Sequence, residues 1–216
     1  MMAARLLGRR LGAVRGVKLC IARSAASRAR PVHTEARLKS LGIELPAPGT
    51  PKANYNIVCW ESPTLLYMSG HLPIRLDGTM VTGAIGPGGR SLEDGQEAAR
   101  WCGLNLIATM QDQLGGDLDR VEKVVKLFGI VSSTAEFKEQ HLVLNGASDV
   151  MMQCFEARRC HSRSAHPEPE PEPDAHASPS PNPDQERGYH ARSAIGTNTL
   201  PLDISVEVEA IVKVKP

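Results

Sequence analysis

The sequence predicts an α+β domain: a single β-sheet with two helices packed on one of its faces. Three patterns predict it: two short apolar runs between residues 55 and 70, an amphipathic segment that starts at Ser91, and an apolar/polar alternation from 204 to 214. The runs and the alternation are typical of strands, and the amphipathic spacing is typical of a helix that covers a sheet.

The two apolar runs predict an antiparallel hairpin. Residues 55–60 (YNIVCW) and 64–70 (TLLYMSG) flank the short segment ESP, which is a turn signal. Residues 79–83 (TMVTG) follow a second turn, LDG, and can extend the sheet as a further strand.

The first predicted helix has clear signals at both ends. Ser91 and Asp94 have the spacing of a capping box, and Gly115 and Gly116 are typical of a helix C-terminus. One face at helical spacing consists of Ala98, Cys102, Leu106 and Thr109.

The sequence of the second half of the domain predicts a strand, a helix and a final strand. Residues 123–131 are rich in Val and favour a buried strand, and residues 145–155 (NGASDVMMQCF) predict a helix capped at Asn145 with Asp149 in its first turn. In the last strand, Ile204, Val206, Val208, Val212 and Val214 alternate with Ser205, Glu207, Glu209 and Lys213.

Residues 1–34 have the composition of a transit peptide. They contain seven Arg and one Lys, no Asp or Glu, and no long apolar core. We expect the mature protein in the mitochondrial matrix, with the plastid or the cytosol as alternatives; a basic tail that binds an acidic partner is another interpretation. No stretch approaches the roughly 18 apolar residues of a membrane span, so no membrane partner is expected.

Residues 156–187 interrupt the domain, which otherwise runs from 35 to 216. They hold seven of the 16 prolines and no Ile, Leu, Val, Phe, Tyr, Trp or Met, so we expect a disordered insertion. A solvated loop is the favoured interpretation, and a Pro-rich docking segment or a mis-joined coding sequence are the alternatives.

The charge disfavours one class of partner, and the cysteines show no pattern of disulfides or metal ligands. Without the eight basic residues of 1–34, 17 Lys and Arg remain against 24 Asp and Glu, so no nucleic-acid partner is expected. Cys59, Cys102 and Cys154 lie in apolar contexts and are interpreted as buried free thiols. No established metal-ligand spacing is present.

Several segments resemble one known family. YMSGHLP, DLDRVEKVVKLFGIVSS, NGASDVM and above all ARSAIGTNTLPLDISVEVEAIV are similar to the YjgF/RidA family, also labelled endoribonuclease L-PSP or chorismate mutase-like. The resemblance implies a chorismate mutase-like subunit that assembles as a homotrimer with sites in the clefts between subunits. It implies hydrolytic deamination of small 2-imino or enamine acids to 2-keto acids and ammonia, with no metal or organic cofactor.

The resemblance also assigns roles to residues. Arg192 matches the arginine that binds the substrate carboxylate, and a planar guanidinium suits that task because it donates two parallel hydrogen bonds. Glu207 matches the acid that orients water, and we expect it to be the catalytic residue. Tyr55 matches a tyrosine that closes the pocket, and Gly70 matches a glycine whose main chain borders the ligand.

Two further positions belong to this predicted substrate site. Asn145 is carried over from the second helix, and Ala194 stands where many members have cysteine, so that no thiol is present but the main chain is kept. Without the resemblance, Arg192 would be interpreted as a surface ion pair with Glu207 or Glu209.

Other interpretations of the function stay open. A trimer that binds small carboxylates without turnover is the alternative to a deaminase, and an endoribonuclease is a third hypothesis, which the acidic mature body and the 4% aromatic content disfavour. His71 is interpreted as a capping or packing histidine and His190 as a loop residue.

Overall fold

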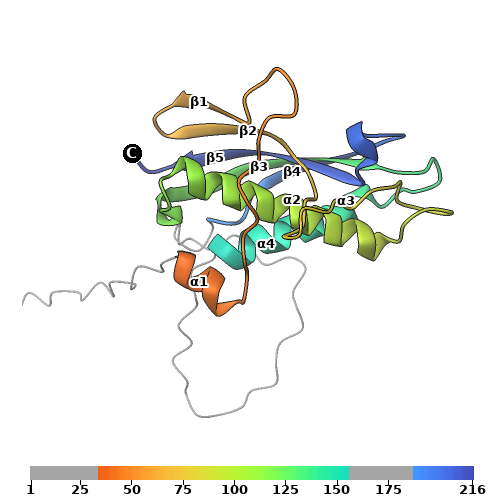
Figure 1. The fold of residues 1–216 in the computed structure, drawn as a ribbon, viewed down its shortest axis with the longest axis horizontal. Coiled ribbons are helices and arrows are strands. Elements are labelled where there is room, and N and C mark those ends of the chain that lie inside the picture. The colour runs from red at the N-terminus through yellow and green to blue at the C-terminus, as the bar shows by residue number, and fades with distance from the viewer. Residues whose placement is uncertain (1–33, 156–186) are drawn as a thin grey trace, which may run out of the picture. The chain divides into compact units, whose positions relative to one another are not determined.

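The computed structural model describes residues 34–155 and 187–216 (Figure 1). Most of the predicted transit peptide and of the Pro-rich insertion lies outside these residues. Thr34 and Arg187, which the sequence analysis assigned to those two segments, belong to the folded part. The amide and the hydroxyl of Thr34 donate to Asp119 Oδ1 at 2.9 and 2.7 Å.

One five-stranded sheet forms the centre of the fold, in the order β1-β2-β5-β3-β4. Its strands are β1 Val58–Ser62, β2 Leu65–His71, β3 Val121–Ser132, β4 Ala191–Thr197 and β5 Val206–Val214. β4 pairs parallel with β3, and the other neighbours are antiparallel. The predicted hairpin, the buried strand and the final strand are therefore confirmed.

Two strand predictions need correction. Residues 79–83 form no strand of the sheet but only the isolated bridges Ile74↔Met80 and Thr82↔Ile204. Residues 191–197 form an edge strand, β4, which the predicted element order did not contain. Its sequence ARSAIGT has no run of apolar residues, because an edge strand buries only part of one face.

The helices are α1 Thr34–Ser40, α2 Leu92–Gln113, α3 Gln140–Val143 and α4 Asn145–Phe155, with the short 3-10 helices η1 Leu118–Arg120 and η3 Pro201–Asp203. The capping box of Ser91 and Asp94 at the start of α2 is confirmed. The predicted cap at Asn145 is wrong, because α3 precedes α4 directly and Leu144 already has helical φ and ψ. None of the helices in the described ranges is long and apolar enough to cross a membrane.

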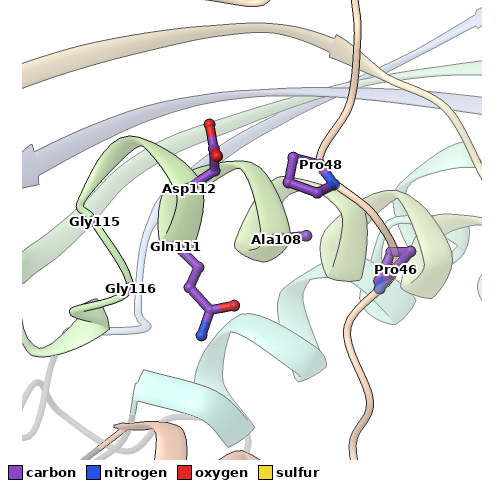
Figure 2. A pocket seen from close by; sticks show the side chains of 7 residues that line it. All are labelled: Pro46, Pro48, Ala108, Gln111, Asp112, Gly115 and Gly116. Carbon is purple, nitrogen blue, oxygen red and sulfur yellow. The ribbon is translucent and has the colours of Figure 1, made fainter.

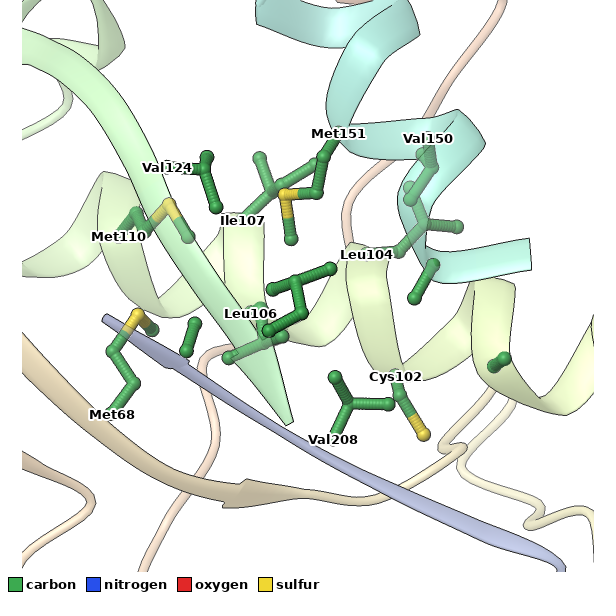
Figure 3. Packing of buried hydrophobic residues seen from close by; sticks show 14 of the residues in the cluster. Met68, Cys102, Leu104, Leu106, Ile107, Met110, Val124, Val150, Met151 and Val208 are labelled. Carbon is green, nitrogen blue, oxygen red and sulfur yellow. The ribbon is translucent and has the colours of Figure 1, made fainter. Parts of the chain in front are cut away.

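The core lies between the sheet and the pair α2 and α4, which cover the same face (Figures 1 and 3). Leu106, Leu127 and Val208 are fully buried there. Cys102 and Cys154 are buried free thiols as expected, but Cys59 is exposed. Cys59 pairs with the exposed Tyr67, and both lie on the face of the sheet that these helices leave uncovered, which we call the open face.

The two described ends that flank the insertion are in contact. The Arg187 guanidinium lies over the ring of Phe155, with 5.7 Å from its carbon to the ring centroid. Arg187 also donates to the carbonyls of Val121 and Leu118 at 2.8 and 3.0 Å. The end of α4 and the approach to β4 therefore meet at the beginning of β3.

Two glycines let α2 and α4 pack closely. A Cβ added to Gly103 of α2 would lie 2.5 Å from Val150 Cγ1, and one added to Gly146 of α4 would lie 1.9 Å from the Gln96 carbonyl oxygen. Real Cβ atoms do not approach a backbone oxygen so closely, so the helices can keep this distance only with glycine at position 146.

We predict that Gly146→Ala lowers the free energy of unfolding by about 3 kcal/mol, because α4 has to move away from α2. Helix propensity alone would favour alanine by about 1 kcal/mol, so the sign of the change shows which effect dominates. Gly49→Ala is the control, since its Cβ would meet its nearest atom at an ordinary 3.5 Å. Urea unfolding of both variants measures the effect, and equal midpoints would contradict close packing.

Candidate functional site

Arg192 and Glu207 lie on opposite faces of the sheet. Arg192 on the edge strand β4 stands opposite the fully buried Leu127 of β3, and its guanidinium reaches α4. Glu207 stands opposite Ile130 of β3 and points to the open face, because its neighbours Val206 and Val208 are buried beneath the helices. Two strand spacings and three residues along β3 separate the two backbones by about 14 Å.

Arg192 is held by neutral partners. Its Nη1 donates to Asn145 Oδ1 and to Ser148 Oγ, both at 3.0 Å. The interpretation of Arg192 as an ion pair with Glu207 or Glu209 is therefore wrong. Within the described residues Nε and Nη2 have no hydrogen-bond partner, so the edge of the guanidinium that can grip a carboxylate through two parallel bonds stays available.

Ser148 and His190 complete the surroundings of Arg192. Ser148 Oγ lies 2.9 Å from His190 Nε2, and His190 Nδ1 donates to the Gly188 carbonyl at 2.7 Å. Burial lowers the pKa of His190; the Gly188 carbonyl opposes this change, and the charge of Arg192 adds to it. Ala194, on the same face of β4 two residues further on, is half-buried and packs against the core.

Glu207 lies directly over Gly70. A Cβ at Gly70 would be 1.6 Å from Glu207 Oε1, so any other residue at position 70 would displace the carboxylate. Burial raises the pKa of the Glu207 carboxyl, and the negative charge of Glu209 adds to the shift. Gly70 and Glu207 thus form a second group, separate from Arg192, Asn145 and Ala194.

Tyr55 joins neither group in this single chain. It precedes β1, its side chain is exposed, and its hydroxyl accepts a hydrogen bond from the Lys52 amide at 3.3 Å. Its role in closing a pocket stays a prediction, because the clefts implied by the resemblance form only between subunits.

His71 is a packing histidine, as interpreted from the sequence. Only 2% of it is exposed, Nδ1 donates to the Ser69 carbonyl at 2.7 Å, and Nε2 accepts from the Thr109 hydroxyl at 2.8 Å. Thr109 Oγ1 in turn accepts from the Gly49 amide at 3.2 Å. The ring therefore joins β2, α2 and the segment before β1, and burial lowers its pKa to about 4.

Two surface hollows lined by described residues lie elsewhere. One of about 340 Å³ is lined by Pro46, Pro48, Ala108, Gln111, Asp112, Gly115 and Gly116 at the end of α2 (Figure 2). Another of about 360 Å³ is lined by residues 133–135, 137, 138, 140 and 196–198, and the buried Thr134 hydroxyl in it has no hydrogen-bond partner among the described residues. Within residues 34–155 and 187–216, no group of three or more His, Cys, Asp or Glu side chains could hold a metal ion.

The family model described as "YjgF/chorismate mutase-like, putative endoribonuclease" matches residues 35–172. The chain belongs to this family. The match to the YjgF family model ends before β4 and β5, so that Arg192 and Glu207 lie beyond it.

Relatives of this YjgF-family chain extend the comparison. Protein TCP17 of Trypanosoma cruzi is 38% identical over 179 residues, which are 82% of this chain and 92% of that protein. The structure of Atu1372, a protein of unknown function from Agrobacterium tumefaciens, is 34% identical, with a TM-score of 0.64 over 85% of this chain and 94% of that one. A "putative endoribonuclease" of Shewanella oneidensis shares the fold at 24% identity, with a TM-score of 0.66 over 85% of this chain and all of that one.

In this YjgF-family chain, sequence reasoning missed Ser148 and His190. Both had a signal. Ser148 follows Asn145 by three residues and so shares its helix face. His190 lies just before β4, as the loop interpretation has it, but it precedes Arg192 by two residues, and alternate residues of an extended chain point the same way. The two periodicities together would have placed both side chains beside Arg192.

We predict that the free energy of unfolding of this YjgF-family protein decreases as pH falls from 6.5 to 4, because His71 is protonated more easily in the unfolded chain. The unfolded chain takes up a proton there with a pKa near 6.5, whereas the folded ring has a pKa of about 4, so the loss reaches about 3 kcal/mol. Above pH 6.5 this contribution is constant. Urea unfolding at several pH values and one protein concentration measures it.

His71→Gln is the control, because glutamine does not titrate. The variant should be less stable at pH 7 but should lose less on acidification than the wild type. Parallel curves for the two proteins would show that His71 is not the titrating group.

Proposed function

We propose that this protein hydrolyses small reactive 2-imino or enamine acids to 2-keto acids and ammonia in a cleft between subunits. The observation that carries the proposal is Arg192, whose Nη1 is held by Asn145 and Ser148 while its Nε and Nη2 edge stays available. A small 2-imino acid offers one strong handle, its carboxylate, and this edge of a guanidinium matches it.

Glu207 is the proposed catalytic acid. The carbon of a protonated imine is already electrophilic, so hydrolysis needs a held water and proton transfers rather than a strong nucleophile. Glu207, half-buried above Gly70, has a carboxyl whose pKa is raised by burial, which moves it toward the range useful for proton transfer near neutral pH. Gly70 leaves the space in which the carboxylate lies, and no cofactor is proposed.

A second copy of the chain is required by this proposal, because Arg192 and Glu207 of one chain face opposite sides of the sheet. The open face also carries Tyr67 and Ile195, which are 45% and 48% exposed and are suited to burial against another copy. A homotrimer, in which β4 of one protomer approaches the open face of the next, would bring both residues to each cleft, and Tyr55 with them.

Binding of small carboxylates without turnover is the second candidate. It is favoured by Ala194, which supplies no thiol where many members of the family have cysteine. Saturable binding of 2-ketobutyrate that Arg192→Ala abolishes, with no release of keto acid from imines, would establish this alternative. For either function we propose the mitochondrial matrix as the location, on the composition of residues 1–34.

We predict that Arg192→Ala lowers kcat/KM about 100-fold, since the loss of a charge-assisted pair of hydrogen bonds costs about 3 kcal/mol. Arg192→Lys should recover little, because an ammonium cannot donate two parallel bonds. The assay couples the protein to a threonine dehydratase and follows keto-acid release above the spontaneous rate.

Arg75→Ala is the matched control. Arg75 makes an exposed ion pair with Glu97, with 2.9 Å between Nη2 and Oε1, and neither residue belongs to the proposed site. It should keep wild-type rates. Wild-type rates in Arg192→Ala as well would exclude the proposed carboxylate site.

We predict that two inactive variants, Arg192→Ala and Glu207→Gln, restore activity when they are unfolded and reassembled together. In a ring of three, each mixed trimer contains one cleft with both wild-type residues, so random assembly recovers about a quarter of the wild-type rate. Each variant refolded alone provides the baseline. If the mixture is no more active than its components, the two residues do not act across a subunit boundary.

A further inference from the structure

The direction of each hydrogen bond around His190 can be assigned. The Gly188 carbonyl oxygen can only accept, so His190 Nδ1, at 2.7 Å, carries the proton. In the neutral ring Nε2 is then the acceptor, and its partner at 2.9 Å, Ser148 Oγ, donates. The pair is a hydroxyl that donates to a neutral imidazole.

Arg192 acts on the other side of the same hydroxyl. Its Nη1 donates to Ser148 Oγ at 3.0 Å, so that the hydroxyl oxygen receives a bond from a cation while its hydrogen points at a base. Both contacts favour loss of the hydroxyl proton, because positive charge stabilises the oxyanion and the imidazole can accept the proton. Ser148 is 7% exposed, so the path for its proton leads to His190 rather than to bulk water.

His71 shows that this ring geometry does not require a cation. There, too, Nδ1 donates to the carbonyl two residues before it, at 2.7 Å, and Nε2 lies 2.8 Å from a helix hydroxyl, that of Thr109. The Thr109 hydroxyl, however, receives its bond from the neutral Gly49 amide. The guanidinium is thus the feature that separates the Ser148 pair from a purely structural one.

Of the charged groups on the elements packed around His190, Arg192 is the one that acts on the ring. Arg192 on β4 lowers its pKa directly. Lys126 on β3 stands opposite Ala191 and therefore points to the open face, away from Arg192. Asp149 on α4 follows Ser148 and is exposed. An anion bound at Arg192 would offset the guanidinium charge and make protonation of His190 easier.

We propose that Ser148 and His190 form a proton-transfer dyad that serves a small carboxylate bound at Arg192. The identity of the substrate rests on the proposed function. Glu207 of the neighbouring protomer orients the attacking water. The water oxygen bonds to the carbon of the protonated imine, the C=N π pair moves to nitrogen, and the water's proton passes to Ser148 Oγ as the serine proton passes to His190 Nε2. The imidazolium returns a proton by the same route to the amine nitrogen. The C–N bond then breaks as the hydroxyl oxygen forms the carbonyl, and the hydroxyl proton leaves with ammonia as ammonium.

The first test compares His190→Gln with His71→Gln in the coupled assay from pH 5 to 8. Glutamine can accept the bond from Ser148 but cannot take its proton, so His190→Gln should lower kcat at least about tenfold with KM within about twofold, and should abolish the acid limb of the rate profile. His71→Gln should lower the free energy of unfolding but should leave kcat and the acid limb of the rate profile unchanged. A wild-type kcat or an unchanged acid limb in His190→Gln overturns the dyad.

The second test does not depend on turnover. In histidine-labelled protein, NMR titrations with and without 2-ketobutyrate follow both rings; bound keto acid should raise the pKa of His190 by about half a unit or more and leave His71 unchanged. The rise should be absent in Arg192→Ala. Bound keto acid that leaves the pKa of His190 in place overturns the dyad, and absence of binding overturns the dyad and the carboxylate site together. If bound keto acid raises the pKa of His190 but the protein deaminates no imine, the proposed deaminase activity is refuted. The coupling between the carboxylate site at Arg192 and the ring of His190 is then supported.

Discussion

The position of β3 between β5 and β4 determines how the two groups of site residues are arranged. β3 pairs antiparallel with β5 on one side and parallel with β4 on the other, and each pairing fixes which face a residue presents. Arg192 and Ala194 share a face with buried residues of β3, whereas Glu207 shares the other face with Ile130. A shift of either register by one residue would exchange these faces, so the hydrophobic burial of β3 and β5 also determines the chemistry.

Close packing of α4 on α2 supports the same arrangement. Asn145 and Ser148, which hold Arg192, lie on α4 within three residues of Gly146, where α4 approaches the backbone of α2. A helix displaced by a side chain at 146 would move both partners relative to β4. The position of the guanidinium therefore depends on a glycine that it does not touch.

The sequence predicts the elements with strong local signals and misses those that depend on tertiary pairing. The capping box at Ser91 and the alternation of β5 are local, so α2 and the last strand are predicted correctly. β4 has no comparable pattern, since as an edge strand it is held by its parallel pairing with β3. Asn145 was predicted as a helix cap because Asn favours that position, but α3 before it leaves its side chain to bind Arg192. Composition alone could not show that Arg192 and Glu207 of one chain face apart, because that depends on strand order.

The two histidines show why a role cannot be assigned from ring geometry alone. His71 and His190 have the same tautomer, the same carbonyl partner two residues earlier and the same kind of helix hydroxyl at Nε2. They differ in the third partner of that hydroxyl, which is a backbone amide in one case and a guanidinium in the other. An amide has a fixed, weak dipole that no ligand changes, so the pair at His71 can only stabilise the fold. A guanidinium carries a charge that a bound carboxylate neutralises, so the proton affinity of His190 changes when the site is occupied.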